Sequence, residues 1–170
     1  MWKFTGKERP SFAKEPAPGQ ESVWDYPRPP ELVNDSRLVE VRLGETLIAR
    51  THQAYRVLET ASPPTFYLPE EDVILSLLMP VDGQSNCEWK GAARYWVLKK
   101  APELGPIGWD YPSPNPAFGS IRNALSFYPD KVDCFVDGEH VRPQPGQFYG
   151  GWVTDEIVGP VKGEPGTGHW

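Results

Sequence analysis

Cysteine and histidine are scarce in this sequence, which has 2 Cys and 3 His among its 170 residues. Cys87 and Cys134 are too few for a disulfide-rich scaffold or for a zinc site built from four cysteines. The histidines fall in a turn, at a hairpin end and in the tail, and no cysteine–histidine spacing suggests metal ligation. We therefore expect no metal site and no cofactor.

Positive charge is also in short supply, since 17 Lys and Arg face 23 Asp and Glu and give a formal net charge of −6. Nonspecific binding to nucleic acid needs a basic face, so we expect no nucleic-acid partner. Long apolar runs are missing too, because the longest patch is residues 73–79 and a membrane span needs about 18 residues. The first residues lack the apolar run of a secretory signal. These absences predict a soluble, cytoplasmic protein without a membrane partner.

Several catalytic motifs are absent as well. The sequence contains no G-x-x-x-x-G-K-[ST] loop and no G-x-G-x-x-G turn between a strand and a helix, which argues against the common nucleotide-binding loops. It contains no G-x-S-x-G elbow. No Gly-Ser pair followed by an Asp-x-Asp metal pair supports nucleotidyl transfer.

Proline, glycine and tryptophan are plentiful, with 20, 16 and 7 residues. Their distribution predicts an extended Pro-rich N-terminal arm (1–35), a β-rich core domain (36–142) and a Gly-, Pro- and Trp-rich C-terminal arm docked on the core (143–170). The N-terminal arm is either a loosely draped leader or partly packed, because large aromatic side chains are costly to leave in water. The aromatic residues of the two arms are Trp2, Phe4, Trp24 and Tyr26 in the first and Phe148, Tyr149, Trp152 and Trp170 in the second.

Local patterns predict a mainly β fold, a single compact domain with one short helix. A Gly-containing turn and an Asp137-Gly138 pair each mark a hairpin. Acidic residues after Pro69 and an apolar face predict a short helix over residues 69–79, ended by Pro80. Residues 109–116 read as a loop, and residues 121–128 fit either a helix or a strand. The expected strands are residues 38–43, 46–50, 54–60, 65–68, 87–91, 93–100, 132–136 and 139–142.

Three charged residues, Arg56, Glu59 and Lys90, fall in apolar, strand-like segments. A charge buried without a partner costs several kcal/mol, so these side chains either pair with one another or line a site. One interpretation is a structural salt-bridge network. The other is a ligand anchor in which Arg56 and Lys90 bind a carboxylate or phosphate. In that case Glu59 accepts a hydrogen bond from the ligand or acts as an acid–base.

Aromatic residues cluster near the same segments and serve either the core or a cage around a planar ligand. Cys87 lies three residues before Lys90, and a nearby ammonium makes a thiol more reactive. No histidine is placed to assist it, so the favoured alternative is a buried, unreactive cysteine. The candidate catalytic residues are Glu59, Cys87 and Lys90. The candidate ligand-binding residues are Arg56, Glu59, Tyr67, Lys90, Tyr95, Trp96, Trp109 and Tyr128.

One short motif occurs twice, as Trp24-Asp-Tyr-Pro and as Trp109-Asp-Tyr-Pro. Two copies do not make a repeat protein. The motif forms either two similar aromatic turns that staple loops to the core or two walls of one aromatic cage.

A series of motifs carries a family resemblance: Arg56-Val-Leu-Glu-Thr, Cys87-x-x-Lys-Gly-x-Ala-x-Tyr-Trp, Trp109-x-x-Pro, Phe127-Tyr-Pro and Val136-Asp-Gly-Glu. Over roughly residues 38–142 this order resembles the domain-of-unknown-function family 427, which is widespread in bacteria and some fungi. That family is also catalogued under a nucleotidyltransferase-like name.

The resemblance implies a compact all-β domain of the β-tent kind, similar in outline to methionine sulfoxide reductase B and to the ligand-binding domain of cereblon. Those relatives hold a structural zinc through four cysteines. This chain has two, so we expect no such zinc.

Three functions are compatible with these features. The first is a binding module for a small anionic or planar ligand. The second is an enzyme of unknown class that uses Glu59 as an acid–base with Lys90 or Arg56, either with or without Cys87 as a nucleophile. The third is an interaction protein whose Trp- and Pro-rich arms dock a protein partner or a second copy of the chain.

Overall fold

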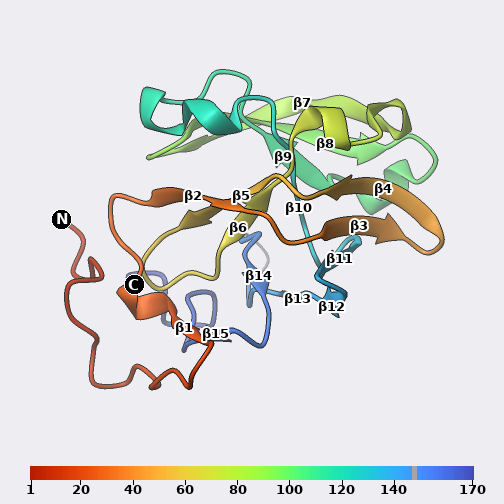
Figure 1. Cartoon of the computed structure of the whole chain (residues 1–170). Helices are drawn as coiled ribbons and strands as arrows, with labels where there is room; N and C mark the ends of the chain where they lie inside the picture. Colours follow the sequence, from red (N-terminus) through yellow and green to blue (C-terminus); the bar gives the residue numbers. More distant parts are fainter. Residues whose placement is uncertain (147–148) are drawn as a thin grey trace.

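Two four-stranded antiparallel sheets form the centre of the fold in the computed structural model, which describes residues 1–146 and 149–170. The first sheet has the order β12-β11-β3-β4 (Figure 1). Its strands are β3 (Val39–Leu43), β4 (Thr46–Thr51), β11 (Asp133–Val136) and β12 (Glu139–His140). Both predicted hairpins are confirmed in this sheet. Asp137 and Gly138 have φ angles of 47° and 83°, as a tight two-residue turn requires.

The second sheet has the order β10-β9-β8-β7. Its strands are β7 (Leu78–Cys87), β8 (Gly91–Leu98), β9 (Gly108–Asp110) and β10 (Ser126–Phe127). Residues 108–110, expected in part to be loop, thus form a strand, and the ambiguous 121–128 segment contains one. β7 lies at the edge of the sheet, where the missing N–H of Pro80 costs no ladder hydrogen bond.

The helix predicted over residues 69–79 is replaced by two 3₁₀ turns, η2 (Glu70–Asp72) and η3 (Leu75–Leu77). Pro80 does not end a helix and lies inside β7. The reason is tertiary hydrogen bonding. Val73 bridges to Ala49, and the Ile74 N–H donates to the Ile48 carbonyl at 2.8 Å. β4 thereby holds the backbone extended at Val73, between the two turns, where the local pattern favours a continuous helix.

A three-stranded sheet, β2-β5-β6, lies beside β3 and β4 and below the β7–β8 hairpin in Figure 1. It consists of β2 (Glu31–Asp35), β5 (Ala54–Leu58) and β6 (Thr65–Tyr67). β2 belongs by sequence to the expected N-terminal arm, and it pairs along its whole length with β5. The remaining 3₁₀ turns are η1 (Val23–Asp25), η4 (Pro102–Leu104) and η5 (Pro116–Ile121).

Both terminal segments pack on the domain, and the two ends of the chain lie on the same side of the molecule (Figure 1). Short strands join the segments to one another and to the core: β1 (Glu21–Ser22) runs parallel to β15 (Ile157–Val158), and β13 (Arg142–Pro143) pairs with β14 (Trp152–Val153). Trp152 is fully buried and stacks on Phe66 with ring centroids 4.7 Å apart. Phe148 lies outside the described residues.

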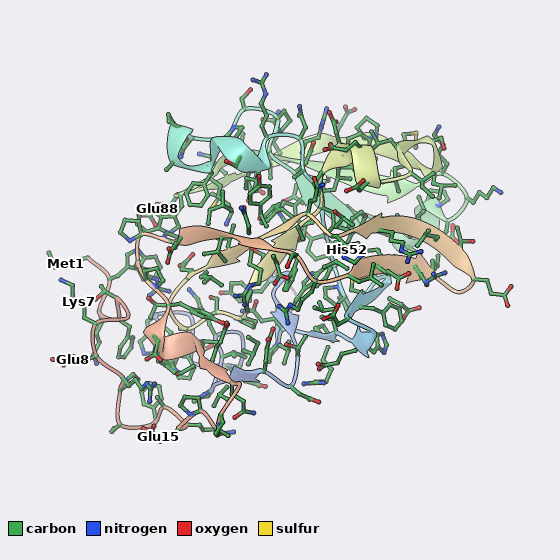
Figure 2. The ribbon with its side chains drawn as sticks, in the orientation of Figure 1. Met1, Lys7, Glu8, Glu15, His52 and Glu88 are labelled. Atoms are coloured by element: carbon green, nitrogen blue, oxygen red, sulfur yellow. The ribbon has the colours of Figure 1, made fainter. Side chains whose placement is uncertain are left out.

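The N-terminal segment combines a buried anchor with an exposed outer edge. Trp24 is fully buried, and its ring contacts those of Phe4 and Trp170 with centroids 5.1 Å away in each case. Figure 2 shows Lys7 and Glu8 pointing outward from the same segment. Among the described residues, no helix is long and apolar enough to cross a bilayer.

Candidate functional site

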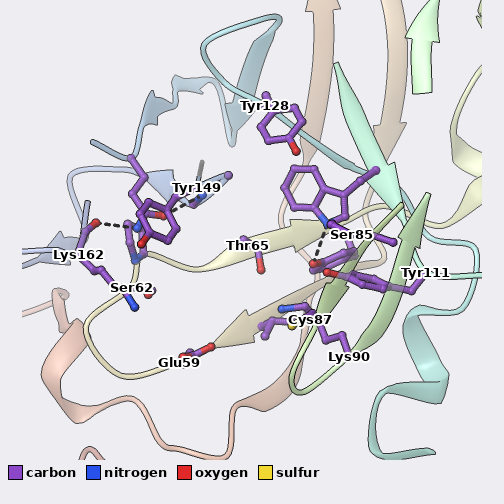
Figure 3. Close-up of a pocket in the computed structure, with 18 of the residues that line it drawn as sticks. Glu59, Ser62, Thr65, Ser85, Cys87, Lys90, Tyr111, Tyr128, Tyr149 and Lys162 are labelled. Atoms are coloured by element: carbon purple, nitrogen blue, oxygen red, sulfur yellow. Dashed lines mark hydrogen bonds between the residues drawn. The ribbon is translucent and has the colours of Figure 1, made fainter. Parts of the chain in front are cut away.

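A cavity of about 390 Å³ opens between the β5–β6 connection, the β7–β8 hairpin and the C-terminal segment (Figure 3). Its size lies within the range of small-molecule sites. Seven of the residues singled out in the sequence line it, namely Glu59, Tyr67, Cys87, Lys90, Tyr95, Trp109 and Tyr128. They are seven of its 20 described lining residues, and a ligand-binding role for them stays a prediction.

Lys90 enters the cavity from the turn between β7 and β8. Gly91, with φ at 108°, provides the reversal, and Asn115 fixes the turn by donating its side-chain N–H to the Trp89 carbonyl and its backbone N–H to the Lys90 carbonyl. These bonds measure 2.8 and 3.0 Å. The hairpin thus holds the lysine backbone in one place and directs its side chain inward.

The Lys90 ammonium is buried without an ion pair. The residue is only 9% exposed, and among the described residues no carboxylate lies within 4.0 Å of its Nζ. Burial disfavours the charge, but interactions with Tyr67, Cys87 and Glu59 outweigh burial and raise the pKa of Lys90. At neutral pH the residue is therefore a cation suited to anchoring an anion rather than an amine nucleophile.

Tyrosine and tryptophan rings form the wall beside Lys90. The Tyr67 hydroxyl accepts a hydrogen bond of 3.2 Å from the Trp109 Nε1–H. Tyr128 packs on Trp109 with ring centroids 4.6 Å apart. Burial raises the pKa of Tyr111 and of Tyr128, so both hydroxyls stay protonated at neutral pH. The wall offers hydroxyl donors on an aromatic surface.

Glu59, at the cavity edge, is bound by Arg28. The Arg28 Nε–H donates to the Glu59 carboxylate at 3.0 Å, and its other nitrogens donate to the Phe4 and Trp170 carbonyls at 3.0 and 2.9 Å. The arginine side chain is 1% exposed and that of Glu59 is 22% exposed. This clasp ties both terminal segments to the end of β5 and neutralises the only carboxylate among the described lining residues.

Residues 31–138, more than half of the chain, match a protein family described as Domain of unknown function (DUF427), whose short name carries a nucleotidyltransferase label. The chain belongs to the DUF427 family. No curated protein matches the sequence. The DUF427 range includes Lys90, Tyr67 and Trp109, whereas the cavity residues Tyr149 and Lys162 lie beyond its end.

Two of the predicted DUF427 site residues are not brought to the cavity. Arg56 is not among the described lining residues, whereas its neighbour Val57 is. Successive side chains of a strand point to opposite faces, so on β5 these two residues cannot both face the cavity. Its guanidinium instead pairs with Glu21 at 2.9 Å and with Asp35 at 3.4 Å. That arrangement matches the structural salt-bridge interpretation for Arg56.

Trp96 also points away from the cavity, because its neighbour on β8, Tyr95, faces the cavity and successive side chains of a strand alternate. The Trp96 ring packs in the main hydrophobic core, and its Nε1–H donates to Asp110 at 3.0 Å. Of the predicted cluster of Arg56, Glu59 and Lys90, only Glu59 and Lys90 line the cavity.

Several lining residues were missed in the sequence: Tyr111, Gln144, Tyr149 and Lys162. Tyr111 belongs to the second Trp-Asp-Tyr-Pro motif, which forms a cavity wall. The first copy places Trp24 in a separate cluster with the terminal segments, so the two copies do not form one cage. The other three residues belong to the C-terminal segment, where no local pattern distinguishes them.

The two thiols have different surroundings. Cys87 lines the cavity and is half-buried, whereas Cys134 is fully buried in β11. Burial raises the pKa of Cys134 well above its ordinary value. Among the described residues, no group of three or more His, Cys, Asp and Glu side chains is arranged to hold a metal ion.

Proposed function

We propose that this DUF427 chain binds a small organic anion, with a carboxylate or phosphate on Lys90 and a planar group against Trp109 and Tyr128. The observation that carries the proposal is the buried Lys90 ammonium, which points into the cavity with no carboxylate partner among the described residues (Figure 3). A ligand anion would supply the missing countercharge.

The hydroxyl groups of the wall favour the same class of ligand. The Tyr67 and Tyr111 side chains carry hydroxyl groups beside the ammonium, and a carboxylate or phosphate oxygen accepts several hydrogen bonds from such groups at once. The ring surface of Trp109 and Tyr128 suits the planar part of an aromatic acid. An amine or another cation would meet Lys90 and would be repelled.

The test is isothermal titration of benzoate and of phenyl phosphate into the wild-type protein and into Lys90→Met, which keeps the apolar stem and removes the charge. Loss of a charge-assisted bond of about 1.5–3 kcal/mol predicts that the affinity falls about ten- to a hundredfold. Lys100→Met, at an exposed lysine outside the cavity, is the matched control and should bind like wild type.

Equal binding by Lys90→Met and wild type contradicts the proposal, as does wild-type protein that binds neither probe. Native mass spectrometry of gently purified protein, followed by denaturation and analysis of any released molecule, then identifies the natural anion.

A further inference from the structure

The C-terminal segment adds a second cation to the cavity. Lys162 lines it together with Gln144 and Tyr149, and all three residues follow the DUF427 range. The Gln144 side chain fixes this wall by donating to the Lys162 carbonyl at 2.7 Å and accepting from the Gly151 N–H at 3.1 Å. Lys162 therefore belongs to a built wall rather than to a loose tail.

The Lys162 ammonium also lacks an Asp or Glu partner. Its Nζ donates to the main-chain oxygen of Trp170 at 3.4 Å, and it lies 5.2 Å from the ring centroid of Trp2 and 5.7 Å from that of Tyr149. Among the described residues no Asp or Glu carboxylate lies within 4.0 Å of its Nζ. Burial and the nearby positive charge of Arg28 lower the pKa of Lys162, and the carboxylate of Glu59 offsets part of that change.

The charges around the cavity do not balance. Lys90, Lys162 and Arg28 are three cations, and Glu59, bonded to Arg28, is the only carboxylate among the described lining residues. Three positive charges against one side-chain carboxylate leave two positive charges without an Asp or Glu partner. Figure 3 shows the two lysine side chains reaching inward from opposite sides, with Thr65 between them.

We propose that the natural ligand is a dianion, an organic acid whose two anionic groups bind Lys90 at one end of the cavity and Lys162 at the other. This inference rests on the proposed function, because it takes anion binding at Lys90 as its first half. Lys90 lies within the DUF427 range and Lys162 beyond it, so the C-terminal segment selects for the second anionic group. A monoanion fills only the Lys90 end.

The test compares benzoate with phthalate, isophthalate and terephthalate, which place a second carboxylate at three spacings on the same ring. Isothermal titration is carried out on wild type, Lys162→Met, Lys162→Arg and the exposed-site control Lys100→Met. At least one dicarboxylate should bind wild type ten times more tightly than benzoate, since a second charge-assisted bond contributes at least that factor.

Lys162→Met should reduce the affinity for that dicarboxylate to the level for benzoate and leave benzoate binding within about twofold of wild type. Lys162→Arg keeps the charge and should retain the preference, which separates loss of the cation from damage to the wall. 4-Carboxyphenyl phosphate shows whether the second group is better as a phosphate.

Two results would contradict the proposal of a dianionic ligand. In the first, no dicarboxylate binds wild type more tightly than benzoate does. In the second, Lys162→Met lowers the affinities for benzoate and for the dicarboxylate by the same factor. In both cases benzoate still binds through Lys90, and the proposed function stands. If the wild-type protein binds neither benzoate nor any dicarboxylate, the proposed function itself fails.

Discussion

The clasp formed by Arg28 is the most concentrated polar contact between the terminal segments and the core. One guanidinium, 1% exposed, donates to the Glu59 carboxylate and to the carbonyls of Phe4 and Trp170, and it stacks on the Trp2 ring with its central carbon 4.0 Å from the centroid. Arg28→Met removes all of these bonds and keeps most of the apolar volume.

Its expected cost follows from the burial of the pair. Removing one partner of a buried ion pair destabilises a protein by about 3–5 kcal/mol. Glu59 is 22% exposed and regains water when the arginine is lost, so we take the lower end, about 3 kcal/mol. For a domain of this size that predicts a fall in melting temperature of about 6–12 °C.

Urea unfolding followed by tryptophan fluorescence measures the change directly. Arg142→Met is the control, because that side chain is 52% exposed and pairs with Asp155, which is 84% exposed. Such surface pairs contribute about 0–1 kcal/mol. Arg28→Lys keeps the charge but cannot reach three acceptors with a planar fork, so its stability should lie between those of wild type and Arg28→Met. A loss below about 1 kcal/mol for Arg28→Met would refute the reasoning.

Two further predictions concern the cavity wall and the thiols. A Cβ added at Gly150 would overlap the Trp109 indole, so Gly150→Ala should lower the free energy of unfolding by about 1–3 kcal/mol and shift the tryptophan fluorescence. Gly119→Ala meets nothing within 4 Å and should behave as wild type; equal effects of the two substitutions contradict the contact. In the folded protein, 5,5′-dithiobis(2-nitrobenzoate) should label Cys87 and leave Cys134 unmodified until urea unfolds the chain, because Cys134 is fully buried and its pKa is raised by burial. Rapid labelling of Cys134 without denaturant would contradict the burial of β11.

The sequence predicted elements whose causes are local. The Asp137-Gly138 turn needs positive φ at both residues, and the residue types alone indicate it. The predicted helix over 69–79 failed because hydrogen bonds from β4, distant in sequence, determine that backbone. Composition and motif order were sufficient for the mainly β fold and for the DUF427 family.

The site residues also divide into those that a local pattern indicates and those that only the three-dimensional fold brings to the cavity. Alternation along β5 separates Arg56 from Val57, but the sequence does not show which face meets the cavity, since that depends on how the three sheets pack. Lys162 reaches the cavity only through the fold of the C-terminal segment, whose Gly- and Pro-rich sequence has no period to interpret.

The arrangement of the terminal segments also determines the order in which parts of the chain can fold. Arg28 and the Trp170 carbonyl it binds are 142 residues apart, and β1 finds its partner only in β15. Contacts between such distant positions slow folding, because a long loop must close before they contribute. During synthesis β1 leaves the ribosome long before β15, so the cavity acquires its last wall only after the segment that carries Gln144 and Lys162 has emerged.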